Sequence, residues 1–253
     1  MECGGLYIMG YNKSLDFLNM IRNGAEPTKN NEAHKTQAQS TTTKSEPEKP
    51  QPRPTAPGNT AHHDAATTNL FAVIDTETNW NDQVMSLGVA IADQNTLKCL
   101  DTRYYIFEQE ARVGGMYSNV MHSCDVKPIM ATRQQAMQDL ASYLADQSIT
   151  DIYAYNAKFD YSHLPELKAY NWFDIMRIAA YRQFNKAIPD SAACCKTGRL
   201  KSNYGVEPIT RMLTGSSRYF EVHNAVADAV DELRIIELLD LPLDTYEIAK
   251  INN

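Results

Sequence analysis

The 253-residue sequence lacks the apolar runs, the leader and the cysteine pattern that three large classes of protein need. It has no stretch of about 18 consecutive apolar residues, so we predict no transmembrane helix and no membrane partner. No basic leader precedes an apolar run, so we expect no secretory signal. The five cysteines are an odd number, and Cys194 and Cys195 are adjacent, which fits neither a disulfide framework nor a zinc site. We therefore expect ordinary thiols and a cytoplasmic protein.

An excess of positive charge is also missing. The formal net charge is −7, which excludes a uniformly basic coat for nucleic acid. Residues 1–68 hold seven Lys/Arg and seven Asp/Glu, so the whole charge falls on the remaining chain, with 17 basic and 24 acidic residues. Such a domain does not suit an acidic ligand unless cations or a local basic patch intervene.

Large apolar side chains are absent from residues 25–68, which contain six of the eleven prolines. Alanine and proline alone cannot offset the entropy lost on ordering the chain. We predict a disordered linker whose proline-rich part is semi-extended. A weaker alternative, a proline-rich ligand for a partner domain, rests on the spacing of Pro47, Pro50 and Pro54.

Residues 1–24 precede this linker and carry a short apolar pattern. Ser14 could cap a helix from about 15 to 22, which is too short to be stable alone. This segment is either a helix that docks on the main domain or a tethered motif for a protein partner, and the sequence leaves both open.

Residues 69–253 are predicted to fold as one domain. Apolar runs and alternating patterns predict four strands, at 70–75, 84–92, 97–107 and 151–155. Thr132 and Gln135 form a capping-box pattern before a helix that ends near 146. Further helices are predicted near 159–168, near 173–184 and from Asn224 to Leu239. Three strands followed by alternating helices and strands indicate an α/β fold with a mixed sheet flanked by helices.

Four acidic residues and one histidine stand at the ends of these elements: Asp75, Glu77, Asp160, His223 and Asp228. Singly, each has an ordinary explanation, such as a solvated turn charge, a carboxylate near a helix dipole or a surface histidine. Together they predict four carboxylates aimed at one point, whose charges two divalent cations about 3.5–4 Å apart would neutralise. The near-neutral pKa of histidine suits the removal of a proton from water.

These residues lie in motifs that resemble those of the DEDDh 3′–5′ exonuclease superfamily, which has an RNase H-like fold. The superfamily includes the proofreading epsilon subunit of bacterial replicative polymerase, RNase T and oligoribonuclease. The matching motifs are Asp-Thr-Glu-Thr at 75–78, Asn-Ala-Lys-Phe-Asp at 156–160, and His223-Asn224-Ala225 followed by Asp228. The resemblance covers about 69–240.

The resemblance implies a 3′–5′ exonuclease that uses two Mg²⁺ or Mn²⁺ ions to release nucleoside 5′-monophosphates from DNA or RNA. It implies that Asp75, Glu77 and Asp228 hold one metal, that Asp75 bridges to a second supported by Asp160, and that His223 is the general base. Its substrates would be single-stranded or 3′-ended nucleic acid. Many relatives are dimers, which leaves a homodimer open.

Seven residues are predicted to contact substrate: Thr76, Thr78, Trp80, Asn156, Lys196, Arg199 and Lys201. Asn79-Trp80-Asn81 replaces a glycine that the family usually has after its first motif, and Ser86-Leu87-Gly88 replaces a Glu-Ile-Gly pattern. We suggest that Trp80 stacks on the terminal base; the alternative is a half-buried core tryptophan.

Residues 186–218 hold six Lys/Arg and two Asp/Glu, which is basic for this acidic domain. We predict a flexible flap that contacts phosphates, with Tyr204 and Tyr219 stacking on bases. The alternative is a solvated loop with scattered charge. Asp174 is predicted to cap a helix, His163 to be structural or exposed, and His122 receives no role.

Two other functions remain open at this point. One is an RNase H-like endonuclease that cuts inside a hybrid duplex, against which the spacing of His223 and Asp228 argues. The other is a catalytically silent binding or scaffold module that recruits a partner through its N-terminal segment. The five intact site residues argue against the second.

Overall fold

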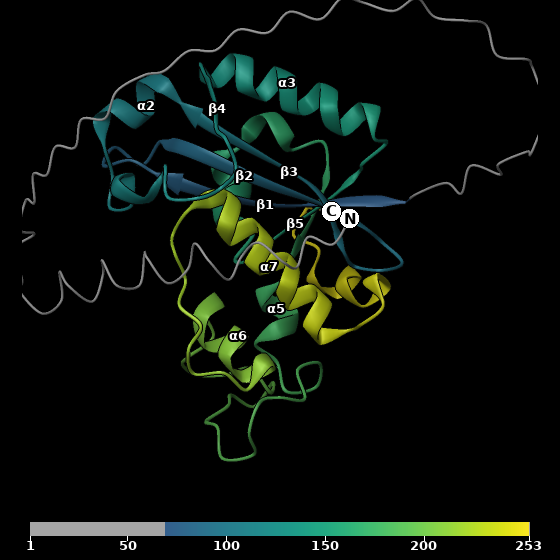
Figure 1. Ribbon diagram of the computed structural model, residues 1–253. Helices are drawn as coiled ribbons and strands as arrows, with labels where there is room; N and C mark the ends of the chain where they lie inside the picture. Colours follow the sequence, from purple (N-terminus) through teal and green to yellow (C-terminus); the bar gives the residue numbers. More distant parts are fainter. Residues whose placement is uncertain (1–68, 253) are drawn as a thin grey trace, which may run out of the picture. The chain divides into compact units, whose positions relative to one another are not determined.

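The computed structural model describes residues 69–252, so the predictions for residues 1–24 and 25–68 lie outside the described residues. The chain divides into two units, and the description concerns the second, Thr67–Asn253. Its centre is a six-stranded sheet in the order β4-β3-β2-β1-β5-β6 (Figure 1). The strands are β1 Leu70–Thr78, β2 Val84–Asp93, β3 Cys99–Phe107, β4 Ile129–Ala131, β5 Asp151–Ala154 and β6 Asn171–Asp174.

The sheet is mixed, because β1, β2 and β3 pair antiparallel while β4, β5 and β6 pair parallel to their neighbours. The α-helices are α2 Glu108–Val113, α3 Arg133–Asp146, α4 Lys158–His163, α5 Met176–Ala179, α6 Val206–Thr214 and α7 Ala225–Leu239. Three 3-10 helices are η1 Ser118–Val120, η2 Pro165–Leu167 and η3 Leu243–Ala249. None of the helices in residues 69–252 is long and apolar enough to cross a membrane.

Helices cover both faces of the sheet (Figure 1). Successive side chains of β1 point to opposite faces, so Phe71 and Val73 pack in the core with α5, α6 and α7. Ala72 and Ile74 pack in the core with α3 on the other face. Because both faces are buried, β1 reads as a continuous apolar run up to its first carboxylate. The predicted α/β fold with a mixed sheet flanked by helices is confirmed.

Helix starts follow the capping residues. The Thr132 side chain accepts from the Gln135 N–H and the Gln135 side chain reaches back, so the predicted capping box is confirmed. The Asn224 side chain accepts from the Ala227 N–H at the start of α7. Asn156 is a turn residue with φ 60°, and Ala157 is the residue that precedes α4.

The helix predicted at 173–184 is confirmed only at Met176–Ala179, because its first two residues belong to a strand and residues 180–184 are not helical. Residues Asn171–Asp174 form β6, whose Trp172 and Phe173 lie opposite Ile152 and Tyr153 of β5. The helical segment that follows, Met176–Ala179, has four residues. Pairing with a buried neighbouring strand therefore overrides the apolar pattern that favoured a helix. The helix predicted at 159–168 ends at His163, before Pro165 starts η2.

The N-terminus of α7 lies directly on β2 at Gly88. A Cβ atom at this position would lie 2.1 Å from the carbonyl carbon and oxygen of Ala225 and 2.3 Å from the nitrogen of Val226. Gly88 is also the partner of Asp75 across the β1–β2 ladder. A residue without a side chain therefore brings the start of α7 next to the first carboxylate.

We expect Gly88→Ala to lower the unfolding temperature by about 5–10 °C, because the methyl group meets rigid backbone and overpacking costs about 1–3 kcal/mol. Calorimetry of the full chain measures this. Gly205→Ala is the control, because a Cβ there meets only the Pro208 Cδ at 3.9 Å. Equal effects of the two variants would show that the contact at Gly88 is not tight.

Candidate active site

The first carboxylates lie within β1, not at its end, because the strand continues to Thr78. Alternation along the strand turns Asp75 and Glu77 toward the face covered by α7. Thr76 points the other way, is buried, and donates its hydroxyl to Asp160 Oδ1 at 2.7 Å. Thr76, predicted as a substrate contact, thus orients the carboxylate that α4 contributes.

His223 and Asp228 come from the start of α7. Asp228 lies in the first turn and is buried. His223 precedes the helix with φ 59°, and its ring stacks on Tyr117 at 4.1 Å between centroids, with 16° between the planes. Ligand atoms of Glu77, His223 and Asp228 all lie within 4.8 Å of one another. The structure therefore brings together three of the predicted site residues, which are far apart in the sequence.

The Asn224 side chain holds the start of α7 in place. Its amide donates to the carbonyl oxygens of Val120 at 2.9 Å and Met121 at 3.2 Å. The cap of α7 is thus tied to the segment that carries Tyr117. No local pattern indicated this contact, because the two segments are more than 100 positions apart in the chain.

Two buried carboxylate oxygens, Asp75 Oδ2 and Asp228 Oδ1, have no hydrogen-bond partner. Burial, reinforced by neighbouring carboxylates, raises the pKa of both groups well above the usual range. Burial likewise raises the pKa of Glu77 to about 8 and that of Asp160 to about 7. An unpaired anion in such a place is costly, and a cluster of carboxylate oxygens is the donor set that Mg²⁺ and Mn²⁺ prefer. These residues therefore fit divalent cations.

The structure adds a carboxylate that the sequence reading missed. Glu232 lies one helical turn after Asp228 and is buried. Its Oε2 accepts a hydrogen bond of 2.9 Å from the backbone N–H of Tyr155. Its charge is the largest carboxylate contribution that raises the pKa of Asp75. The i, i+4 spacing from Asp228 was the available signal, since it places both side chains on one helix face.

Glu221 lies beside this group, where burial and then the charges of Asp231 and Glu207 raise its pKa to about 7. The Tyr219 side chain is also buried there, and its hydroxyl donates to Asp231 at 2.7 Å. The prediction that Tyr219 stacks on a base is therefore wrong.

Trp80 is 67% exposed, so its alternative as a half-buried core residue is wrong. The backbone N–H of Trp80 donates to the Gly114 carbonyl at 2.9 Å, which places Trp80 beside the segment that carries Tyr117. Thr78 is partly buried at the end of β1, and Asn156 is exposed. Phe159 and His163 form a tilted ring contact at 4.3 Å, and His163 Nε2 lies 3.1 Å from Asp82, which confirms a structural role for His163.

The predicted flexible flap is an ordered segment. Its second half contains α6, and its first half is joined to the chain before it by bonds from Leu200 N–H to Ala180 O and from Arg182 N–H to Gly198 O. Lys196, Arg199 and Lys201 remain exposed on it. Tyr204 is partly buried, with the Arg199 guanidinium 5.6 Å from its ring centre. The basic character of the segment is therefore retained without an open loop.

Asp174 was predicted to cap a helix, but it ends β6 and lies one residue before Ile175, the N-cap of α5. Its Oδ1 accepts the N–H groups of Met176 at 3.0 Å and Asn156 at 3.1 Å. It thereby joins the ends of β5 and β6 to the first turn of α5.

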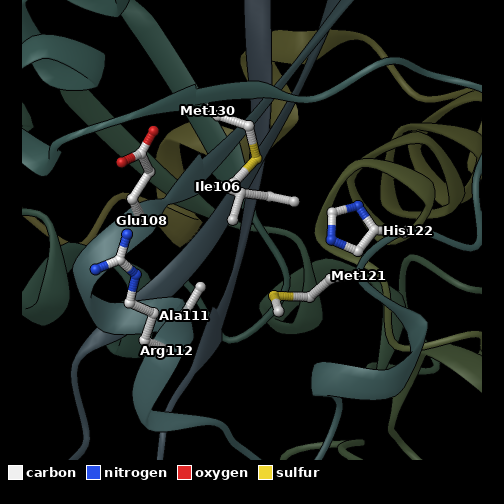
Figure 2. Close-up of a pocket in the computed structure, with 7 residues that line it drawn as sticks. All are labelled: Ile106, Glu108, Ala111, Arg112, Met121, His122 and Met130. Carbon is white, nitrogen blue, oxygen red and sulfur yellow. The ribbon is translucent and has the colours of Figure 1, made fainter.

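A separate hollow lies beside β3 and α2 and contains none of these carboxylates. Figure 2 shows Glu108, Ala111 and Arg112 on one side of it and Met121 and His122 on the other, with Ile106 and Met130 between them. His122, which received no predicted role, lines this hollow and not the acidic cluster.

No model of a protein family matches the sequence, and a comparison with curated proteins finds no match. Solved structures do match. The nuclease domain of 3′hExo, described as a DEDDh family member bound to rAMP, is 13% identical, with a TM-score of 0.50 over 74% of this chain and 98% of that chain. A full-length 3′-exonuclease is 14% identical, with a TM-score of 0.50 over 74% of this chain and 91% of the other.

The chain has the fold of the DEDDh-family 3′-exonucleases. The predicted RNase H-like exonuclease fold is thus confirmed. At 13–14% identity the likeness concerns the fold, so the chemistry of this domain is argued from its own residues.

The raised pKa values predict how the metal-free domain responds to pH. A carboxyl group whose pKa is higher in the folded than in the unfolded chain loses its contribution to stability as the pH rises through the folded value. For Glu77 this window runs from 4.5 to about 8. In EDTA, we expect the unfolding temperature to fall by about 5–10 °C between pH 5 and pH 8.

Added Mg²⁺ or Mn²⁺ should reverse this loss at pH 8 and act much less at pH 5, because protonated carboxyl groups bind cations poorly. Asp75→Asn should make the unfolding temperatures at pH 5 and pH 8 in EDTA more nearly equal. Unfolding temperatures that are equal at both pH values in EDTA would contradict the burial of charge at this site.

Proposed function

We propose that the protein is a divalent-metal-dependent 3′–5′ exonuclease acting on single-stranded or 3′-ended DNA or RNA. The observation that carries this proposal is the pair of buried, partnerless oxygens on Asp75 and Asp228, with Glu77 and His223 beside them. Asp75, Glu77 and Asp228 would hold one cation, and Asp75 with Asp160 a second. Two Mg²⁺ or Mn²⁺ ions supply, when bound, charge neutralisation and polarisation of the attacking water and the leaving oxygen.

His223 would take the proton from the attacking water. Burial lowers the pKa of His223, so its imidazole is neutral and ready to accept a proton at pH 7. Stacking on Tyr117 holds the ring in place. The water oxygen then bonds to phosphorus, the bond from phosphorus to the 3′ oxygen breaks, and a nucleoside 5′-monophosphate leaves a strand one nucleotide shorter.

Two structural relatives support a nucleic-acid substrate through their descriptions. One is 3′hExo bound to rAMP, and another is a 3′-exonuclease in a study of 3′-end recognition of a histone mRNA stem-loop, 13% identical with a TM-score of 0.50 over 71% of this chain and 65% of that chain. One description names a ribonucleotide and the other an mRNA stem-loop. A protein partner for residues 1–24 and a homodimer stay predictions.

The test is digestion of 5′-labelled single-stranded DNA and RNA of one sequence with Mg²⁺ or Mn²⁺. We expect a ladder that shortens from the 3′ end and releases 5′-monophosphates. Asp75→Asn should slow it by about 10³-fold or more, because metal charge stabilisation contributes several kcal/mol. Asp125→Asn is the matched control, since Asp125 is exposed and lies outside the cluster.

His223→Gln in the same assay should lower kcat by about 10²–10⁴-fold. The wild-type rate should rise with pH through a pKa below the usual value of a histidine, and the variant should lack this rise. Internal fragments from hybrid duplexes, or intact strands with a folded protein, would refute the exonuclease.

Trp80 is proposed to stack on the base at the 3′ end, since its indole is exposed beside the segment that holds Tyr117. Trp80→Ala should raise KM by about 5–100-fold, as expected from about 1–3 kcal/mol for each stacked base. The unfolding temperature should not change, because the side chain is solvent-exposed. A variant with normal KM and lowered unfolding temperature would contradict this role.

A further inference from the structure

A second hollow opens at the carboxyl ends of β5 and β6, and we call it the β5–β6 hollow. Its volume is about 570 Å³, within the range of sites that hold small molecules. The residues that decide its chemistry are Asn156, Lys158, Arg177, Tyr181, Phe184 and Arg199. Asn156 and Arg199 are two of the residues for which the sequence predicted substrate contacts.

The charge of this hollow is positive, although the domain around it is acidic. Asp174 is the carboxylate that lines the hollow. Its Oδ1 accepts two backbone N–H groups, and its Oδ2 lies 3.6 Å from the Nε atom of Arg177. Within residues 69–252, neither Lys158 nor Arg199 forms an ion pair. Two cations therefore face this hollow without an anionic partner, which suits a phosphate.

Aromatic side chains form part of the wall. Tyr181 and Phe184 are partly buried, so their positions are fixed while part of each ring stays accessible. Tyr181 forms a backbone bridge with Arg199, which ties the aromatic wall to one of the cations. Aromatic rings beside cations are the usual combination in proteins that bind single strands, because every base has a face that can stack.

The β5–β6 hollow lies beside the proposed catalytic carboxylates. Asn156 and Lys158 belong to the turn and helix that carry Asp160. In the sheet order, β1 lies between β2 and β5, so Trp80 at the β1–β2 turn and the hollow at the end of β5 flank the carboxylates of β1. A strand whose 3′ base lies at Trp80 can therefore continue past the carboxylates into this hollow.

We propose that the β5–β6 hollow binds the phosphate and base of a nucleotide on the 5′ side of the scissile bond. This assignment rests on the proposed exonuclease, which sets the direction of the strand. The ligand chemistry is a nucleotide phosphate beside an aromatic wall. A free nucleoside monophosphate carries the same chemistry, and the test separates it from a strand.

The experiment measures binding of labelled single strands of two to eight nucleotides to the full chain, with Ca²⁺ to limit hydrolysis. Wild-type affinity should rise with length. Arg199→Gln and Lys158→Gln should each weaken binding of the longer strands by about tenfold, with the smallest loss for the dinucleotide. Each variant should also lower the dependence of log affinity on log salt by about 0.7.

Lys127→Gln is the matched control, because Lys127 is exposed next to β4 at the opposite edge of the sheet from β6. It should leave the affinity for strands of every length unchanged. If the Arg199 and Lys158 variants behave like this control, the proposal is overturned, whether or not the wild-type protein produces a ladder.

The remaining outcomes separate the two proposals and the two sources of phosphate. A length-dependent loss in a protein that yields no ladder would support strand binding in the β5–β6 hollow and refute the exonuclease. Arg199→Gln could instead bind free 5′-AMP more weakly and bind strands of every length as the wild type does. That result would show a site for a free nucleotide and overturn strand binding.

Discussion

Mutual repulsion among buried carboxylates is the constraint on which the rest of this structure depends. Asp75, Asp160, Asp228 and Glu232 come from three elements and are desolvated together. A chain can hold like charges at short range only on elements that resist separation. The acids accordingly lie on a central strand, on a helix packed against bare backbone at Gly88, and on a helix whose carboxylate is held by a hydroxyl.

The chemistry changes along the edge of the sheet on either side of these acids. An exposed aromatic residue lies at the β1–β2 turn, and cations with aromatic walls lie beyond β5. In a domain of net negative charge, this asymmetry would give the proposed polyanionic substrate a preferred orientation. Side chains of different chemistry therefore lie next to one another along the carboxyl ends of the parallel strands, which is where ligands of α/β sheets usually bind.

Much of this arrangement could be predicted from the sequence, because it depends on local patterns. Apolar runs identified β1, β2 and β3, and side-chain caps identified the starts of α3 and α7. β6 was not predicted, and its last two residues were assigned to a helix, because only its partner β5 distinguishes the two patterns. The stacking of Tyr117 on His223 depends on distant segments, so no local pattern could reveal it. Glu232 was missed although its i, i+4 spacing from Asp228 was a local signal.

The exposure of Trp80 has an optical consequence. The sequence contains two tryptophans, and the other, Trp172, is fully buried and donates its indole N–H to the Leu167 carbonyl. The fluorescence of the exposed indole responds to water and to dissolved quenchers, whereas that of the buried indole is shielded from both. The protein therefore carries two native reporters, one for events at the mouth of the candidate site and one for the integrity of its core.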